Sequence, residues 1–173
     1  MEFTELIERR RSVRGYRPDP VEPDKLRRVL EAARLAPTAC NRQPFRILVV
    51  STRGREQELR RIYHAPWFAS APLIVCACGL PKENWVRRDG KNYNDVDVTI
   101  AMDHLILAAA NEGLGTCWIA AFDPAAAREV LALPPNVELV AVTPLGYPAE
   151  TPVGPGRRPL EELVYYEHWG QRG

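Results

Sequence analysis

The stretch DVTIAMDHLILAAANEGLGTCWIAAFD (97–123) joins a long apolar helix pattern to a glycine turn and a strand pattern. Over 95–112 the apolar residues occupy most of the helix circumference, which predicts a helix buried on more than one side. A partner subunit is a candidate for the second side, because a chain of 173 residues offers a single core. Gly113 and Gly115 then end the helix, and the run over 116–122 predicts a strand.

Outward from this stretch, the chain alternates between helix and strand patterns. Pro23 suits the first turn of a helix, and the polar segment 81–94, with its Asp89-Gly90 turn, predicts an exposed loop. That loop is either a substrate lid or a plain surface loop, and the pattern leaves both open. The other elements expected are helices over 3–11, 23–36, 55–63 and 124–132, and strands over 45–51, 72–79 and 137–144.

The C-terminal residues are too apolar for a free tail. A stretch rich in proline and glycine (148–159) leads into PLEELVYYEHWG (159–170), which carries six large apolar side chains. Because apolar burial is the main favourable contribution to association, we expect this segment to dock on another surface.

Composition limits the classes of function. The 173 residues are 46% hydrophobic, which indicates one domain with a core of its own. Basic residues number 23 against 22 acidic ones, so the net charge of +1 argues against a nucleic-acid-binding protein. The first residues lack the order of a signal peptide, and no apolar run approaches the ~20 residues that cross a bilayer. We therefore expect a cytoplasmic protein without a membrane partner.

No metal site is expected, because the cysteines lack CxxC spacing and the histidines are scattered. These residues are Cys40, Cys76, Cys78, Cys117, His64, His104 and His168. The three cysteines in strand-like runs are interpreted as small buried side chains. Three acidic residues of the long helix, Asp95, Asp97 and Asp103, are interpreted as caps or solvated positions.

The run RRRSVR (9–14) places four arginines and a serine hydroxyl within six residues. Guanidinium groups bind phosphate oxygens through paired hydrogen bonds, and a hydroxyl adds one more donor. Taken alone, the run fits an anion site and a solvated basic helix end equally well. A second pair, Arg157 and Arg158, lies near the C-terminus, and a dianionic phosphate would account for paired arginines at both ends.

Five segments, in this order and spacing, resemble the nitroreductase superfamily of FMN-dependent flavoproteins in its short single-domain form. They are RRRSVRGY (9–16), APTACNRQPFR (36–46), DVTIAMDHLILAAANEGLGTCWIAAFD (97–123), PLGYP (144–148) and GRRPLEELVYYEHW (156–169). The resemblance covers nearly all of residues 1–173 and implies one α+β domain with a mostly antiparallel sheet of four strands flanked by helices. It also implies an intertwined homodimer that the partner's C-terminal segment, about 156–173, completes.

The resemblance further implies where FMN binds. In the family, basic residues near both termini hold the FMN phosphate, the backbone of the loop after the second helix lines the flavin ring, often from the opposite subunit, and a strand end presents a backbone N–H to flavin N5. The corresponding residues are Arg10, Arg11, Ser12, Arg14, Arg157 and Arg158 for the phosphate, Pro37, Thr38 and Ala39 for the ring, and Ala120 and Ala121 for N5.

The loop after the second helix departs from the family pattern. Ala39-Cys40 replaces hydroxyl-bearing residues and Phe45 replaces the usual tryptophan, so only the backbone contacts of this loop carry over. We interpret Cys40 as a buried filler rather than a group beside the cofactor.

The implied activity is transfer of hydride from NAD(P)H to bound FMN and on to a nitroaromatic, quinone or related small acceptor, by a ping-pong mechanism. Because the flavin carries the redox chemistry, the chain needs no set of acid and base side chains. The alternatives are a reductive dehalogenase or enoate-type reductase of the same superfamily, a non-catalytic flavin-binding or regulatory protein, and a basic nucleic-acid-binding module.

Overall fold

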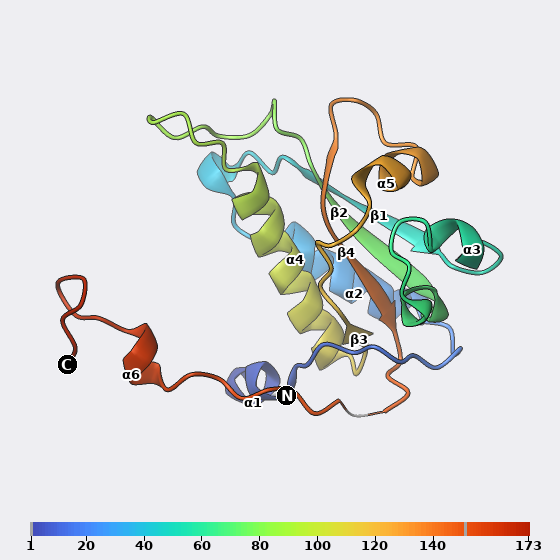
Figure 1. The fold of residues 1–173 in the computed structure, drawn as a ribbon, viewed down its shortest axis with the longest axis horizontal. Coiled ribbons are helices and arrows are strands. Elements are labelled where there is room, and N and C mark those ends of the chain that lie inside the picture. Colours follow the sequence, from blue (N-terminus) through green and yellow to red (C-terminus); the bar gives the residue numbers. More distant parts are fainter. Residues whose placement is uncertain (1, 151) are drawn as a thin grey trace.

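In the computed structural model, which describes residues 2–150 and 152–173, four antiparallel strands form one sheet in the order β1-β2-β4-β3 (Figure 1). The strands are β1 (Phe45–Ser51), β2 (Leu73–Gly79), β3 (Gly115–Thr116) and β4 (Glu138–Gly146). The helices are α1 (Phe3–Arg9), α2 (Pro23–Arg34), α3 (Glu56–Leu59), α4 (Asn94–Asn111), α5 (Pro124–Val130) and α6 (Leu160–Leu163), with short 3-10 helices η1 (Ala39–Asn41) and η2 (Pro66–Ser70). The predicted α+β class is confirmed.

The strand β2 forms the centre of the sheet. It pairs with β1 on one side, where Val49 lies opposite Val75, and with β4 on the other, where Val75 lies opposite Thr143. All of its residues except Leu73 are buried. A strand covered on both faces has a continuous apolar sequence rather than an alternating one, which explains the run LIVCACG.

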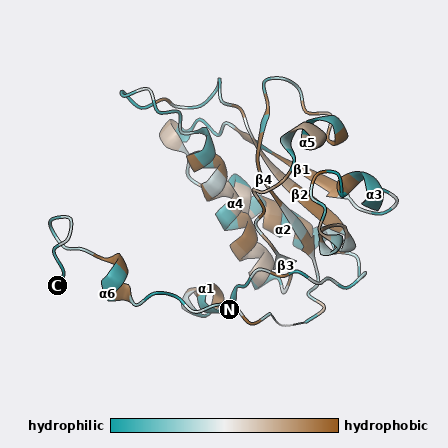
Figure 2. Cartoon of the chain, in the orientation of Figure 1, coloured by the Kyte–Doolittle hydropathy of each residue, from teal (hydrophilic) through white to brown (hydrophobic). Residues whose placement is uncertain are grey.

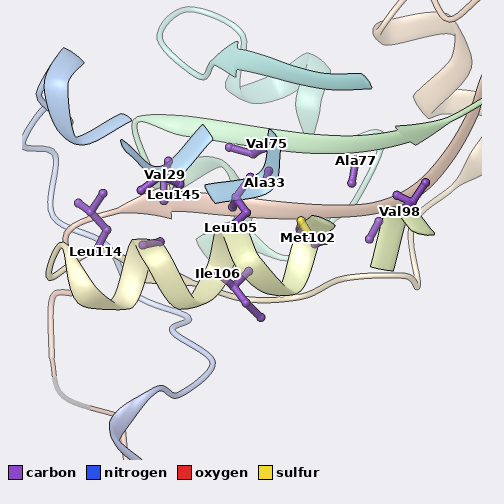
Figure 3. Packing of buried hydrophobic residues seen from close by; sticks show 12 residues of the cluster. Val29, Ala33, Val75, Ala77, Val98, Met102, Leu105, Ile106, Leu114 and Leu145 are labelled. Carbon is purple, nitrogen blue, oxygen red and sulfur yellow. The ribbon is translucent and has the colours of Figure 1, made fainter. Parts of the chain in front are cut away.

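One face of the sheet is covered by α2 and α4. Val75 and Ala77 of β2 pack here with Met102 and Leu105 of α4 and with Ala33 of α2 (Figure 3). All five side chains are inaccessible to solvent. Replacing a fully buried leucine such as Leu105 by alanine costs about 2–5 kcal/mol, so this layer fixes α4 firmly against the sheet.

The opposite face of the sheet is covered by η2, α3 and α5. Ile74, Cys76 and Cys78 occupy alternate positions of β2 and face this layer, where Phe68 of η2 is fully buried. The prediction of buried cysteines is confirmed for Cys76, Cys78 and Cys117.

The helix α4 is apolar on nearly its whole circumference, as its sequence predicts. The side that packs on the sheet is buried, whereas Ile100, Leu107 and Ala110 remain partly exposed and Val96 is exposed. The second apolar side of α4 is thus open to solvent in a single chain.

The strand predicted over 116–122 is wrong for most of its length. β3 ends at Thr116, and one isolated bridge from Ile119 is the only further pairing of this segment with β4 in residues 2–150 and 152–173. The ladder is interrupted because the Cys117 N–H donates to the side-chain oxygen Oγ1 of Thr143, at 2.9 Å, instead of to a main-chain carbonyl. The segment after β3 therefore has no continuous strand pairing and is held to β4 at Cys117 and at Ile119.

Several helices are shorter than predicted. α1 ends at Arg9 because Arg10 leaves the helical region, with φ −57° and ψ 129°. α2 begins at Pro23 as predicted but ends at Arg34, since the residue before Pro37 is sterically excluded from continuing a helix. α3 covers only Glu56–Leu59 and gives way to turns, and α5 ends at Val130.

Beyond residue 152 the chain leaves the body of the domain and ends near α6 (Figure 1). Figure 2 colours part of α6 in this separated segment as hydrophobic. Leu160 and Trp169 are 67% and 92% exposed. Of the helices in the part of the chain that the structure describes, none is both long and apolar enough to cross a bilayer.

Candidate functional site

The segment that follows α1 lies along the edge of β3. The Val13 N–H donates to the Thr116 carbonyl at 2.8 Å, and Ser12 forms a parallel bridge with the same residue. Gly115 permits this close approach, because a Cβ atom there would lie 2.8 Å from the Val13 side chain. The buried Tyr16 hydroxyl donates to the Val13 carbonyl at 2.8 Å and fixes the other end of the segment.

Ser12 pairs with Thr116, the residue before Cys117, and this places the segment 10–14 near the Cys117 thiol. Successive side chains of an extended chain point to opposite sides, so Arg10, Ser12 and Arg14 share one face. Burial raises the pKa of the Cys117 thiol, and the charge of Arg14 opposes that rise. Hydrogen bonding to Ser12 and the charge of Arg10 lower the thiol pKa as well. Neither arginine forms an ion pair with a carboxylate of the described residues, so two guanidinium groups and a hydroxyl are available to an anion.

The other residues predicted to bind the phosphate are Arg11, Arg157 and Arg158, and they make different contacts. Arg11 points to the opposite face, where its Nη1 donates to the carbonyls of Glu8 and, at 2.9 Å, of Arg10. Arg11 lines a cavity of about 490 Å³ together with Arg10, whereas Ser12 and Arg14 are absent from that lining. Two further predicted residues, Arg157 and Arg158, are exposed on the C-terminal segment, where no ion pair within the described ranges involves them.

Ala120 and Ala121 come shortly after Cys117 in the chain, and both are exposed. The main-chain bridge of Ile119 with β4 fixes the chain before them, and the Asp123 N–H donates to the Ile62 carbonyl at 2.8 Å just after them. Among the hydrogen bonds of residues 2–150 and 152–173, none uses the N–H of either alanine. These two N–H groups are therefore positioned donors beside side chains small enough to admit a flat ring.

The loop after α2 is a tight turn built on Thr38. Its Oγ1 accepts the Gln43 N–H at 3.0 Å, and its carbonyl accepts the Asn41 N–H at 3.0 Å. Cys40, Asn41 and Gln43 all have φ of 52°, in the left-handed region that non-glycine residues seldom adopt. The interpretation of Cys40 as a buried filler is wrong: the left-handed turn leaves its side chain exposed.

One chain does not bring the loop and the arginine cluster together. Pro37, Thr38 and Ala39 lie at the N-terminal end of α4, and the extended segment 10–16 lies at its C-terminal end (Figure 1). α4 has 18 residues, which corresponds to a length of about 27 Å. The residues predicted to line the ring and those predicted to bind the phosphate are therefore brought into one site only if two copies contribute to it.

Sequence reasoning missed one residue next to this loop. Asp97 is 2% exposed and its Oδ1 accepts the Ala39 N–H at 3.0 Å, so its interpretation as a cap or solvated position is wrong. The helix period contains the signal that identifies it: Ala101 and Leu105, four and eight residues further on, are fully buried, so Asp97 must lie on the same buried face.

The polar segment 81–94 is mostly exposed and forms a hairpin-like turn, although Asn84 is buried and Asn94 is the buried first residue of α4. Val86 and Asn92 form an antiparallel bridge, and the Trp85 and Tyr93 rings meet edge to face with centroids 5.0 Å apart. At the tip, the Arg87 guanidinium binds the Asp89 carboxylate. The prediction of an exposed loop is confirmed, and its role as a substrate lid stays a prediction.

The fold is an α+β domain with arginines and, among the described residues, unpaired main-chain N–H groups in neighbouring segments. The sequence matches the model of the nitroreductase family over residues 7–67 and 61–147, and the chain belongs to that family.

Three relatives match along almost their whole length. A Thermus thermophilus protein named NADH dehydrogenase is 31% identical, over 91% of this chain and 92% of that protein. The crystal structure of a nitroreductase family protein from Clostridium difficile 630 superimposes with a TM-score of 0.86 at 38% identity, covering 97% of this chain and 99% of that one. A nitroreductase family protein from Clostridium novyi NT gives a TM-score of 0.80 at 31% identity, over 99% and 97% of the two chains.

Proposed function

We propose that this protein is an FMN-dependent oxidoreductase that passes hydride from NAD(P)H to a small acceptor such as a nitroaromatic or a quinone. The observation that carries the proposal is the pairing of the segment 10–14 with Thr116, which places Ser12 and two arginines without ion pairs in the described chain, Arg10 and Arg14, a few residues before Ala120. Three extended residues span about 10 Å. The spacing suits a ligand with a phosphate at one end and a ring at the other.

The arginine cluster favours FMN over a dinucleotide. A terminal phosphate carries close to two negative charges and three acceptor oxygens, which two guanidinium groups and a hydroxyl match. The chain also lacks the G-x-G-x-x-G fingerprint that binds a bridging pyrophosphate at a helix N-terminus. Both observations support a mononucleotide.

The complete site requires a homodimer. The Pro37–Ala39 loop and the arginine cluster lie at opposite ends of α4, and the open apolar side of that helix is suited to pairing with a second copy. An antiparallel pairing would bring the loop of one protomer to the arginines of the other. The apolar C-terminal segment, which carries Arg157 and Arg158, would then cross to the partner.

The chain's own residues bind and orient, and they supply no acid or base. FMN, when bound, supplies the hydride chemistry. Arg10, Ser12 and Arg14 would hold the phosphate, and the N–H groups of Ala120 and Ala121 would be donors to the ring. The name of the Thermus relative, NADH dehydrogenase, supports a nicotinamide reductant.

Anaerobic mixing of FMN-loaded protein with NADH, and separately with NADPH, tests the proposal. We expect the flavin absorbance to bleach with at least one nicotinamide and to return when a quinone or nitroaromatic is added. A non-catalytic flavin-binding protein would keep its oxidised spectrum with both nicotinamides, and that result would overturn the assignment. Free FMN at the same concentration serves as the control.

A further inference from the structure

A buried carboxylate holds the loop that the proposed function places against the flavin ring. Asp97 lies in the first turn of α4, and its Oδ1 accepts the Ala39 N–H at 3.0 Å. Its other oxygen, Oδ2, is buried without a hydrogen-bond partner in residues 2–150 and 152–173. The Ala39 amide is thus the polar partner of a carboxylate that is only 2% exposed.

This arrangement holds Asp97 in a fixed position. The Asp97 N–H donates to the Tyr93 carbonyl at 3.0 Å, so the residue that binds the loop is itself part of the first helical hydrogen bond. The loop is therefore attached to α4 through Asp97, and α4 is packed firmly in the core.

The loop needs such an anchor. Cys40, Asn41 and Gln43 all have positive φ, a conformation that persists only where the surroundings impose it. Thr38 closes the turn internally, but that bond does not attach the loop to the body of the domain. The hydrogen bond from Ala39 to Asp97 makes that attachment in the middle of the segment 37–41.

We propose that Asp97 is the positioning residue for the flavin-facing loop: by holding the Ala39 amide, it sets the backbone of residues 37–41 at the distance and angle that the flavin ring requires. The proposal rests on the proposed function in taking this loop as ring-facing. It predicts that Asp97 influences FMN affinity without touching FMN.

The test compares Asp97→Ala and Asp97→Asn with Asp103→Ala, which removes an exposed carboxylate from the same helix. Hydrogen exchange of peptides over 37–43 in FMN-free protein reports on the loop, and FMN fluorescence quenching gives Kd. Hydrogen bonds to charged groups are strong, so we expect Asp97→Ala to speed exchange over 37–43 and to raise Kd by about tenfold or more. Asp97→Asn keeps an acceptor oxygen, so its exchange over 37–43 and its Kd for FMN should lie close to those of the wild type. Asp103→Ala should match the wild type in both measurements.

A second variant keeps the test decisive if Asp97→Ala folds poorly. Ala39→Pro removes the amide donor and leaves the carboxylate, and Thr38 already has the extended backbone, φ −133° and ψ 156°, that a following proline demands. It should speed exchange over 37–43 and raise Kd as Asp97→Ala does. Wild-type exchange and Kd in either variant would overturn the inference. If wild-type protein binds no FMN, the proposed function fails, whereas the exchange data still decide whether Asp97 holds the loop.

Discussion

The phenolic oxygen of Tyr147 lies 2.6 Å from Glu22 Oε2 and 2.8 Å from Oε1, so one hydroxyl joins the residue before α2 to the residue after β4. Lys25 Nζ donates to the same oxygen at 2.7 Å. The hydrogen bond from Tyr147 holds the pKa of the Glu22 carboxyl below its usual range. The contact therefore stabilises the fold in a way that depends on pH.

Replacing Tyr147 by phenylalanine should lower the melting temperature at neutral pH. Because the folded-state pKa of Glu22 is depressed, the bond stabilises the fold above the unfolded-state pKa and is lost as pH falls through the folded-state value. We expect the difference in Tm between wild type and Tyr147→Phe to be steady from about pH 8 to 6 and to narrow below about pH 4. Tyr166→Phe, on the exposed tail, is the control, and a difference that does not narrow in acid would contradict the assignment.

Cys40 should be the one rapidly reacting thiol of the native chain. It is exposed, whereas the other three cysteines are buried, and burial raises the pKa of the Cys78 thiol to about 11. Titration of native protein with a chromogenic disulfide should release about one equivalent per chain quickly, and denaturant should release the rest. Cys40→Ser should abolish the fast phase. A fast phase that survives this substitution would show that a strand thiol is accessible.

The C-terminal segment should be required for dimerisation. Its side chains, such as Trp169 at 92% exposure, remain uncovered within one chain. Deletion of residues 159–173 is expected to give a monomer, an aggregate or a protein that has lost FMN, as measured by light scattering on a sizing column and by flavin absorbance. A soluble dimer that retains FMN after the deletion would refute this role.

Steady-state kinetics should follow a ping-pong pattern. With small side chains at Ala120 and Ala121, one open position serves nicotinamide and acceptor in turn, so the nicotinamide must leave before the acceptor enters. We expect parallel double-reciprocal lines and mutual competition at high concentrations. Intersecting lines would rule out the single-position mechanism.

The same mechanism needs no individual histidine or cysteine. Substitutions of His64, His104, His168 or Cys40 should each cost less than the ~10²-fold that marks loss of a general acid or base. Flavin reduction followed in rapid mixing, on variants shown to be folded and loaded with FMN, measures this cost. Near-complete loss of reduction in one such variant would contradict it.

Much of the fold was predictable because its elements carry strong local patterns. The apolar run of β2 and the period of α4 each reflect burial that the sequence alone reveals. The strand over 116–122 was not predictable in its true form, because a β-like sequence gives no warning that Thr143 Oγ1 takes the Cys117 N–H out of the ladder. Long-range side-chain hydrogen bonds of this kind do not change the hydrophobic periodicity of the sequence.

The candidate site was predictable in its residue types but not in its geometry. The sequence predicted a helix over 3–11, which includes Arg10, whereas α1 ends at Arg9 and the chain from Arg10 onward is not helical. The sequence does not show that the Pro37–Ala39 loop and the arginines lie at opposite ends of α4, because that separation depends on tertiary packing. The exposure of Cys40 depends on tertiary packing in the same way, whereas the burial of Asp97 can be inferred from its helical spacing to Ala101 and Leu105.

The central claim is that the arginine cluster holds FMN, and flavin retention tests it most directly. Wild-type protein mixed with excess FMN and desalted should keep an oxidised flavin spectrum. Arg10→Ala/Arg14→Ala should lose it, because each charged hydrogen bond contributes about 1.5–3 kcal/mol. Arg17→Ala should retain it, because that arginine pairs with Asp19 at 3.3 Å and lies over the Tyr147 ring. A wild-type protein that leaves the column without flavin, or a double variant that keeps as much as wild type, would contradict the claim.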